Sequence, residues 1–546
     1  MEWMLANWRC TLDRSTTATA QVQVASMLLV TKQCTVVALT FAVLCAVVPP
    51  LTAVNVLAIE PLPARSHWTF MRAVLIAMAT GGRGHNVTAY TPFASSSAIT
   101  DGVCNGGPIG CGYVEIPLRL GVPDKVALDV QRAIADFADQ WRFVGIAVDK
   151  SQTACGLLDR MAAAGHFSGV RYDVVVVELV SSECTSRVSG ALGEVPLVYV
   201  FPSPIASWVE AKALGTSPGP SYASRLFARY AKPDTLARRL ENAYGWTVMA
   251  ALQWFHERGD DQAGYRKPAV TFVNTDLTVE KSVPVVQNMI GIGGVHLPPP
   301  EPIPSDILKF IEESPNGVIF FTFGTVVALS TLPDHIQIAF KNALAEVPQR
   351  VLLKYEGEMT DKPKNVMTSK WLPQRDILMH PNVKLFIGHG GISGVYEAVD
   401  AGVPVLGFPL FYDQPRNVAN LVDAGMALSM DLFSVTKDTL LNAINEIINN
   451  ETYSKNAKIT SELFKDRPMS PAESVVYWTE YVIRHKGAPH LKSHALNLTW
   501  YQYFLLDVIA VALLLIISVC YIVFKTLQLI KKLIFKSSSK SKSKPD

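Results

Sequence analysis

The chain has 546 residues, of which 49% are hydrophobic and 18% charged, and its formal net charge is +2 at pH 7. This length predicts about two to four domains, and the apolar fraction is enough for large cores and some membrane-embedded sequence. A net charge so close to zero gives no indication of a nucleic-acid partner, because proteins that bind nucleic acids usually carry basic surfaces.

Residues 1–53 are predicted to be a leader followed by a secretory signal peptide. Lys32 precedes an apolar run over Thr35–Val48, and small residues follow up to Ala53. This order of basic, apolar and small residues is typical of a cleaved signal. Because the leader ahead of the apolar run is long, we expect the true start at Met27. Cleavage near Ala53 would begin the mature chain at about Val54; the alternative is a retained N-terminal anchor.

The region from 54 to 295 alternates short apolar strands with helical stretches. Strands are predicted at Val54–Ile59, Asp173–Leu179 and Pro196–Val200, and helices at Thr69–Met78, at Ala127–Trp141 and in a run that ends near Glu257. This alternation favours a parallel, doubly wound sheet.

A segment rich in glycine and proline, Gly293–Pro304, predicts the linker to a second region from 296 to 490. That region opens with an apolar strand, Gly317–Phe323, which runs into the small-residue turn Gly324–Thr325. We therefore expect two α/β domains in succession.

The second region contains the most informative segment of the chain, a predicted β-α-β unit. Its parts are a strand at Lys384–Gly388, a turn at His389–Gly391, a helix at Ile392–Ala401 and a strand at Val403–Phe408. A helix that opens directly from glycines presents free backbone N–H groups at its positive end, and this arrangement suits a phosphate or a diphosphate.

Polar residues at fixed places accompany this unit. Trp371 and Gln374 precede it, Glu397 lies on its helix, and Asp413 and Gln414 follow its second strand. Open α/β sheets bind ligands at the carboxyl ends of their strands. An aromatic ring, an amide, a phosphate cradle and carboxylates together suit a sugar nucleotide. The alternative is an ordinary β-α-β unit with a glycine turn.

The C-terminal part is predicted to cross a membrane once, at residues 503–524, where Asp507 is the sole charge. About 20 apolar residues are enough to span a bilayer as a helix. Aromatic residues precede the span, and a lysine-rich tail, 525–546, follows it. The positive-inside rule places this tail in the cytosol and the body in the lumen. Lys542 and Lys544 resemble a retrieval signal for the endoplasmic reticulum; the alternative to the whole reading is a buried soluble helix.

Other features fit a luminal body. Asn86, Asn450 and Asn497 begin glycosylation sequons. Cys104 and Cys111 flank a glycine-rich loop and could form a disulfide. No spacing of cysteine and histidine resembles a zinc site.

The segment from Trp371 to Gln414 resembles the signature of the UDP-glycosyltransferases, a family of membrane-bound animal sugar-conjugating enzymes, and the resemblance extends over about 54–530. It implies two Rossmann-like domains of the GT-B type with a cleft between them, an acceptor-binding domain at 54–295 and a donor-binding domain at 296–490. It also implies inverting transfer of a sugar from a UDP-sugar, as co-substrate, to a hydroxyl of a small lipophilic acceptor at the endoplasmic reticulum membrane. No cofactor is implied, and a homo-oligomer is allowed.

The resemblance assigns the donor site residue by residue. Trp371 would stack on uracil, Gln374 would lie near the uridine, and Glu397 would bind the ribose hydroxyls. The diphosphate would be held by the turn and the start of the helix, with the candidates Thr325, His389, Gly391, Ser393 and Gly394. Asp413 and Gln414 would hold hydroxyls of the sugar. Ser393 departs from many vertebrate members, which have Asn there. The chain looks more like invertebrate members, so we expect UDP-glucose, with UDP-glucuronate as the alternative.

His67 matches the catalytic histidine of the family. It follows the first strand and a proline-containing loop and precedes a predicted helix for which Ser66 is the expected N-cap. A histidine here would act as general base on the acceptor hydroxyl. The resemblance pairs it with a carboxylate, Glu178, where vertebrate members have Asp; Glu183 is the runner-up. The glycines at 81 and 82 look like an insertion that we expect to shorten the helix.

The sequence contains no D-x-D, the usual metal–diphosphate ligand of metal-dependent sugar transferases, so we predict no metal requirement. A different reading is a catalytically silent relative that binds an apolar ligand or partner.

Overall fold

The computed structural model describes residues 53–62, 64–82, 84–94, 112–118, 156–178, 188, 192–193, 195–204, 214–216, 219–225, 227–257, 267–324 and 327–540. Several predictions lie outside these residues: the leader and signal, the helix at Ala127–Trp141, the cysteines of the luminal part, the lysines at 542 and 544, and the site candidates Glu183 and Thr325.

Within the described residues, the first α/β region is built on a seven-stranded parallel sheet of order β3-β2-β1-β4-β5-β6-β7. Its strands are β1 (Asn55–Ile59), β2 (Asn86–Thr91), β3 (Gly112–Pro117), β4 (Val174–Glu178), β5 (Leu197–Phe201), β6 (Val270–Val273) and β7 (Met289–Gly291). Strands β4, β5 and β6 are buried along their whole length. Burial on both faces explains why their sequences are continuous apolar runs without alternation.

The second region carries a six-stranded parallel sheet, again counted over the described residues, of order β10-β9-β8-β11-β12-β13. Its strands are β8 (Val318–Thr322), β9 (Arg350–Lys354), β10 (Val366–Ser369), β11 (Val383–Gly388), β12 (Val405–Gly407) and β13 (Ala427–Ser429). The two sheets with flanking helices confirm the predicted α/β class.

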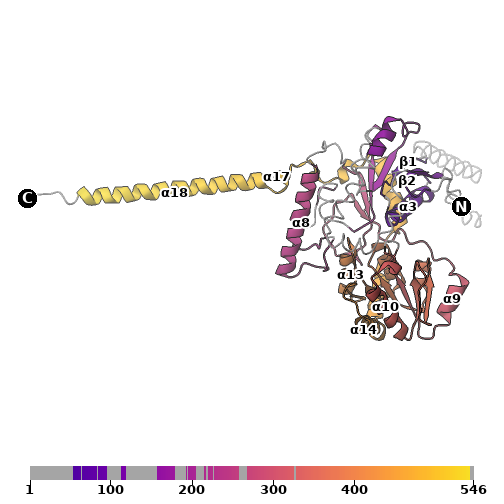
Figure 1. Cartoon of the computed structure of the whole chain (residues 1–546). Helices are drawn as coiled ribbons and strands as arrows, with labels where there is room; N and C mark the ends of the chain where they lie inside the picture. Colours follow the sequence, from indigo (N-terminus) through magenta and orange to yellow (C-terminus); the bar gives the residue numbers. More distant parts are fainter. Residues whose placement is uncertain are drawn as a thin grey trace, which may run out of the picture. The chain divides into compact units, whose positions relative to one another are not determined.

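The second sheet separates two apolar cores, one on each of its faces, and helices cover both cores (Figure 1). Among the described residues, the α-helices of the body include α3 (Arg65–Thr80), α8 (Leu236–Glu257), α9 (Ser305–Glu312), α10 (Asp334–Glu346), α11 (Gln374–Leu378), α12 (Ile392–Ala401), α13 (Gln414–Asp423), α14 (Lys437–Asn449), α15 (Glu451–Lys465) and α16 (Pro471–Arg484). Short 3-10 turns lie at Leu329–Thr331, Pro489–Leu491 and His494–Asn497. Helix α10 packs against α14 on one face, and α12 packs against α15 on the other.

The chain returns to the first sheet after it completes the second. Helix α16 packs on α3 and β6, and its Val475 and Val482 are buried in the core beneath the first sheet. The sequence did not indicate this return, because the apolar face of α16 does not specify which sheet it covers.

Helix α3 differs from its prediction at both ends. It begins at Arg65, with Ala64 as an N-cap that makes no side-chain hydrogen bond, so the expected N-cap role of Ser66 is wrong. It runs to Thr80, so the glycine pair does not shorten it. A Cβ at Gly81 would lie 2.5 Å from a methyl group of Val476 on α16. The glycines therefore allow the end of α3 to approach α16 closely.

The C-terminal helix is interrupted before it becomes long. A short helix, α17 (Trp500–Tyr503), precedes Leu505, which has a φ of 55°, a conformation that breaks a right-handed helix. Helix α18 (Leu506–Lys540) follows as one continuous helix (Figure 1). Its segment Leu506–Phe535 is long and apolar enough to cross a membrane. The helix thus begins later than the predicted 503 and continues beyond 524.

Candidate active site

The predicted base and its carboxylate partner meet at the carboxyl end of the first sheet. Glu178 is the last residue of β4, and His67 lies in the first turn of α3. The distance between Nδ1 of His67 and Oε1 of Glu178 is 2.6 Å. Because Nδ1 faces the carboxylate, Nε2 is the ring nitrogen that is left for a substrate proton.

Burial controls the electrostatics of this pair. Glu178 is fully buried, and burial raises its pKa to about 7, although the neighbouring carboxyl group of Glu60 opposes the rise. Burial also lowers the pKa of His67, while the carboxyl groups of Glu60 and Asp413 act in the opposite direction. The His67 side chain is nevertheless 23% exposed, so part of the ring is accessible to a substrate. A neutral imidazole at neutral pH is the form that a general base requires.

Sequence reasoning missed Glu60. It follows β1 directly and is fully buried. Burial and the charge of Glu178 raise its pKa well above the ordinary value. A glutamate placed immediately after a buried strand is costly unless it has a partner, and this signal could have identified it.

The predicted phosphate cradle is built around His389. Helix α12 begins at Ile392 with Gly391 as an N-cap that has no side-chain cap, so the first N–H groups of the helix remain available to a ligand. The His389 ring lies between two glycines: a Cβ at Gly324 would lie 2.8 Å from the ring, and one at Gly391 would overlap Nε2. Gly324 also has a φ of 73°.

Lys354 adds a cation to the cradle that the sequence did not indicate. It ends β9, and its Nζ donates to the carbonyl oxygen of Gly324 at 2.5 Å and to Glu356 at 3.0 Å. Burial, followed by the positive charge of Lys354, lowers the pKa of His389 to about 4. His389 is therefore neutral at physiological pH, and one ring nitrogen can donate a hydrogen bond without the ring carrying charge.

The candidates for uridine binding lie together at the start of α11 and on α12. Nε2 of Gln374 donates to Oε2 of Glu397, and burial raises the pKa of Glu397 to about 7, although this hydrogen bond opposes the rise. Trp371 stands just ahead of them with 68% of its surface exposed. An aromatic face this open is available for stacking.

Asp413 and Gln414 lie at the start of α13, where hydrogen bonds fix their side chains. Asp413 is the N-cap, and its Oδ2 accepts from Nδ2 of Asn417 at 2.9 Å. Burial raises the pKa of Asp413 to about 6, although the amide of Asn417 and the charge of Arg416 lower it. Oε1 of Gln414 accepts from the N–H of Leu410 at 2.9 Å, so its amide NH₂ is the part that could serve a ligand.

His67 and Asp413 lie close enough for each to affect the pKa of the other, which brings the first group of candidates near the second. The carbonyl oxygen of Ser393 lies 3.3 Å from Nε2 of His296, and a Cβ at Gly394 would lie 3.1 Å from Nε2 of Gln374. The described candidates thus form two groups, one around His67 and Glu178 and the other around the start of α12.

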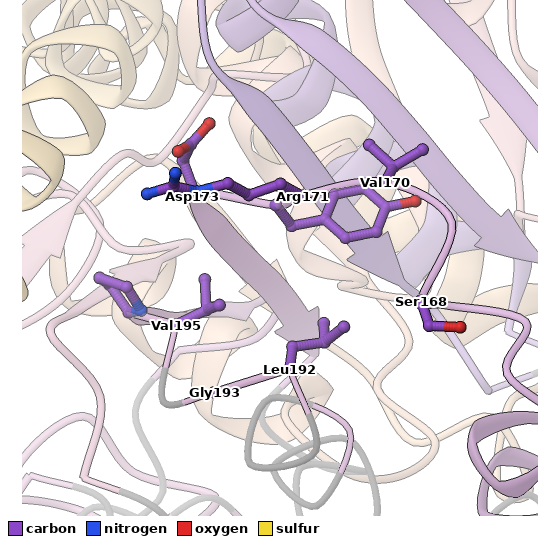
Figure 2. Close-up of a pocket in the computed structure, with 9 residues that line it drawn as sticks. Ser168, Val170, Arg171, Asp173, Leu192, Gly193 and Val195 are labelled. Carbon is purple, nitrogen blue, oxygen red and sulfur yellow. The ribbon is translucent and has the colours of Figure 1, made fainter.

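One cavity lies away from these residues. It has a volume of about 480 Å³ and is lined by residues that include Arg171, Asp173 and Val195 (Figure 2). These residues precede β4 and β5, whereas Glu178 stands at the opposite end of β4. The cavity is therefore separate from the candidate active site.

The sequon asparagines occupy three different settings. Asn86 is exposed at the start of β2, and Asn450 caps α15 by accepting from the N–H of Thr452. Asn497 accepts from Nζ of Lys267 at 2.7 Å. Their glycosylation stays a prediction.

The fold is shared with solved GT-B glycosyltransferases. LpCGTa in complex with UDP has a TM-score of 0.53 at 18% identity, covering 79% of this chain and 100% of that chain. The glycosyltransferase VinC in complex with DTDP has a TM-score of 0.53 at 16% identity, with coverage of 79% and 100%. The predicted GT-B class is therefore confirmed.

The family described as UDP-glucoronosyl and UDP-glucosyl transferase matches residues 56–541. UDP-glucosyltransferase 2 of Dactylopius coccus is 36% identical over 488 residues, covering 86% of this chain and 92% of that protein. UDP-glucuronosyltransferase 2B13 of Oryctolagus cuniculus is 30% identical over 506 residues, covering 87% and 93%. The chain belongs to this family of UDP-glycosyltransferases, as the segment from Trp371 to Gln414 predicted.

Proposed function

We propose that this glycosyltransferase moves a sugar from a UDP-sugar to a hydroxyl of a small lipophilic acceptor, with inversion at the anomeric carbon and with His67 as general base. The observation that carries the proposal is the 2.6 Å contact between His67 and the buried Glu178. A carboxylate on Nδ1 fixes the ring and stabilises the imidazolium that forms when Nε2 takes a proton.

The proposed step is a single displacement. Nε2 of His67 removes the acceptor's hydroxyl proton while the oxygen attacks the anomeric carbon. The bond from that carbon to the UDP oxygen breaks, and its electron pair leaves with UDP. The N–H groups at the start of α12, together with His389 and Lys354, would stabilise the developing charge on the diphosphate. One displacement inverts the configuration.

For the donor, we infer uracil stacked on Trp371 and ribose hydroxyls bound to Glu397. The carboxylate of Asp413 and the amide NH₂ of Gln414 would bind hydroxyls of the sugar. Thr325 remains a proposed diphosphate contact outside the described residues.

UDP-glucose is the favoured donor and UDP-glucuronate the alternative. A glucuronate carboxylate is best held by an arginine. Arg416 is the arginine beside Asp413, and it is engaged by Glu280 at 3.0 Å and by the carbonyl oxygen of Ser224 at 3.1 Å. This engagement favours a neutral sugar.

We further infer an endoplasmic reticulum membrane location, with α18 as the single span, the body in the lumen and the lysine-rich tail in the cytosol. The long apolar segment Leu506–Phe535 supports the span. A homo-oligomer stays a prediction.

EDTA is expected to leave UDP release unchanged, within about twofold, because the sequence has no D-x-D and the diphosphate charge would be met by protein N–H groups and Lys354. The measurement compares initial rates in EDTA with rates after added Mg²⁺ or Mn²⁺. Loss of activity in EDTA that either ion restores would contradict the prediction.

The proposal is tested by measuring UDP release from membranes that contain the full chain, with a panel of phenols and either UDP-glucose or UDP-glucuronate. Turnover with UDP-glucose in excess of that with UDP-glucuronate is expected. UDP binding without turnover on either donor would favour the catalytically silent relative.

A further inference from the structure

A second buried carboxyl group stands directly behind the proposed base. Strands β1 and β4 are parallel neighbours, and their register pairs Ile59 with Val177. The next residues along these strands, Glu60 and Glu178, therefore lie side by side at the same sheet edge. Both side chains are fully buried.

Each of the two carboxyl groups has one oxygen that receives no hydrogen bond from a described residue. Oε1 of Glu60 accepts from the N–H of Leu62 at 3.0 Å, and Oε1 of Glu178 takes the contact with His67. Among the described residues, Oε2 of each glutamate is buried without a donor. Two ionised carboxylates in this position would repel each other at high desolvation cost, whereas one proton between them gives each oxygen a partner.

We propose that Glu60 is a neutral carboxylic acid that donates a hydrogen bond to the Glu178 carboxylate and thereby acts as a positioning residue for the His67 base. This inference rests on the proposed role of His67. Two hydrogen bonds then converge on the Glu178 carboxylate, one from the Glu60 hydroxyl group and one from Nδ1–H of His67. No net proton transfer beyond the His67 step is needed.

The pKa directions agree with this order. Burial, and then the charge of Glu178, raises the pKa of Glu60 well above the ordinary value, whereas the carboxyl group of Glu60 lowers that of Glu178. Both directions favour the proton on Glu60 and the charge on Glu178. Among the described residues, the other titratable groups that act on the pair are His67 on α3 and Tyr412 from the loop that leads into α13, and Asp413 in turn acts on His67.

A hydrogen bond donated to the Glu178 carboxylate should lower the proton affinity of the His67–Glu178 pair. Without it, the less stabilised carboxylate makes protonation of the pair easier, and the base is lost at a higher pH. The acid limb of the pH profile of kcat/KM belongs to the coupled pair. It is the readout that a merely structural role of Glu60 would not move.

The test compares Glu60→Gln with Glu60→Leu in the full chain. Glutamine keeps an N–H donor and leucine does not. Glu60→Leu is expected to move the acid limb upward by about one pH unit, the size of one hydrogen bond to a charged group. Glu60→Gln is expected to keep the wild-type acid limb and to lose several-fold less turnover than Glu60→Leu. Equal acid limbs in all three proteins, or an equal upward shift in both variants, would overturn the proposal.

Infrared spectroscopy tests the same inference without relying on turnover. The wild-type protein at neutral pH should show the C=O band of a buried protonated carboxyl group that shifts in D₂O and is absent from Glu60→Gln. This measurement also decides the matter if Glu60→Leu fails to fold. Absence of the band in wild type overturns the proposed pair even in an active enzyme. Its presence in a chain without turnover keeps the pair and counts against the proposed function instead.

Discussion

Replacing His67 with alanine is expected to reduce the turnover number for UDP release by at least about a hundredfold, because a positioned general base typically contributes ~10² to 10⁴ in rate. Acceptor hydroxyls are weak acids, and alanine leaves no group beside Glu178 to remove their proton. The dissociation constant of UDP should stay within about threefold, since His67 lies outside the group around the start of α12. Initial rates and equilibrium binding of UDP on the same preparation measure both quantities.

His166→Ala is the matched control for this variant. His166 is an exposed histidine of the same α/β region, in the turns that precede β4. It should retain wild-type turnover. If His67→Ala keeps more than a third of wild-type turnover while His166→Ala is unchanged, His67 is not the base.

Gly391→Ala is expected to weaken UDP binding and to raise the KM for UDP-sugar by at least about tenfold. The backbone of Gly391 has a φ of −61°, which alanine adopts readily, so the fold should survive. The added methyl group would overlap Nε2 of His389 and force the ring out of its place between two glycines. Loss of one hydrogen bond to a charged group corresponds to about 1.5–3 kcal/mol, or roughly 10- to 100-fold in affinity.

Gly357→Ala is the control, because a Cβ there would lie 3.6 Å from its nearest neighbours, an ordinary contact. Thermal unfolding of both variants in detergent separates a local effect from loss of the fold. Unchanged UDP affinity in Gly391→Ala would show that the His389 cradle does not hold the diphosphate.

The parts of the site that could be predicted from sequence are those with a local signal. Helix α12 was predicted at its observed bounds, Ile392–Ala401, because a glycine turn before it and a glycine after it mark its ends. Strand β12 proved shorter than Val403–Phe408, which reflects the usual uncertainty of element ends. The residue facing His67 was also predictable, since Glu178 ends an otherwise apolar strand.

Other parts depend on contacts between distant segments. Glu60 had a local signal, because it directly follows a buried strand, but its place beside Glu178 depends on the register of β1 with β4, which no single stretch of sequence records. Lys354 lies near His389 because two strands from different β-α units end at the same edge. The packing of α16 on α3 likewise depends on contacts between distant segments. The role of the glycines at 81 and 82 depends on Val476 of α16, which lies beside them in the folded chain.

The most direct test of the central claim is the configuration of the product. UDP-glucose carries an α-linked sugar, and the full chain would be incubated with it and an accepted phenol before the anomeric proton of the conjugate is examined by NMR. A β-glucoside, formed together with one equivalent of UDP, is the predicted result of a single displacement assisted by His67. An α-glucoside would contradict it, as would release of free glucose without a conjugate.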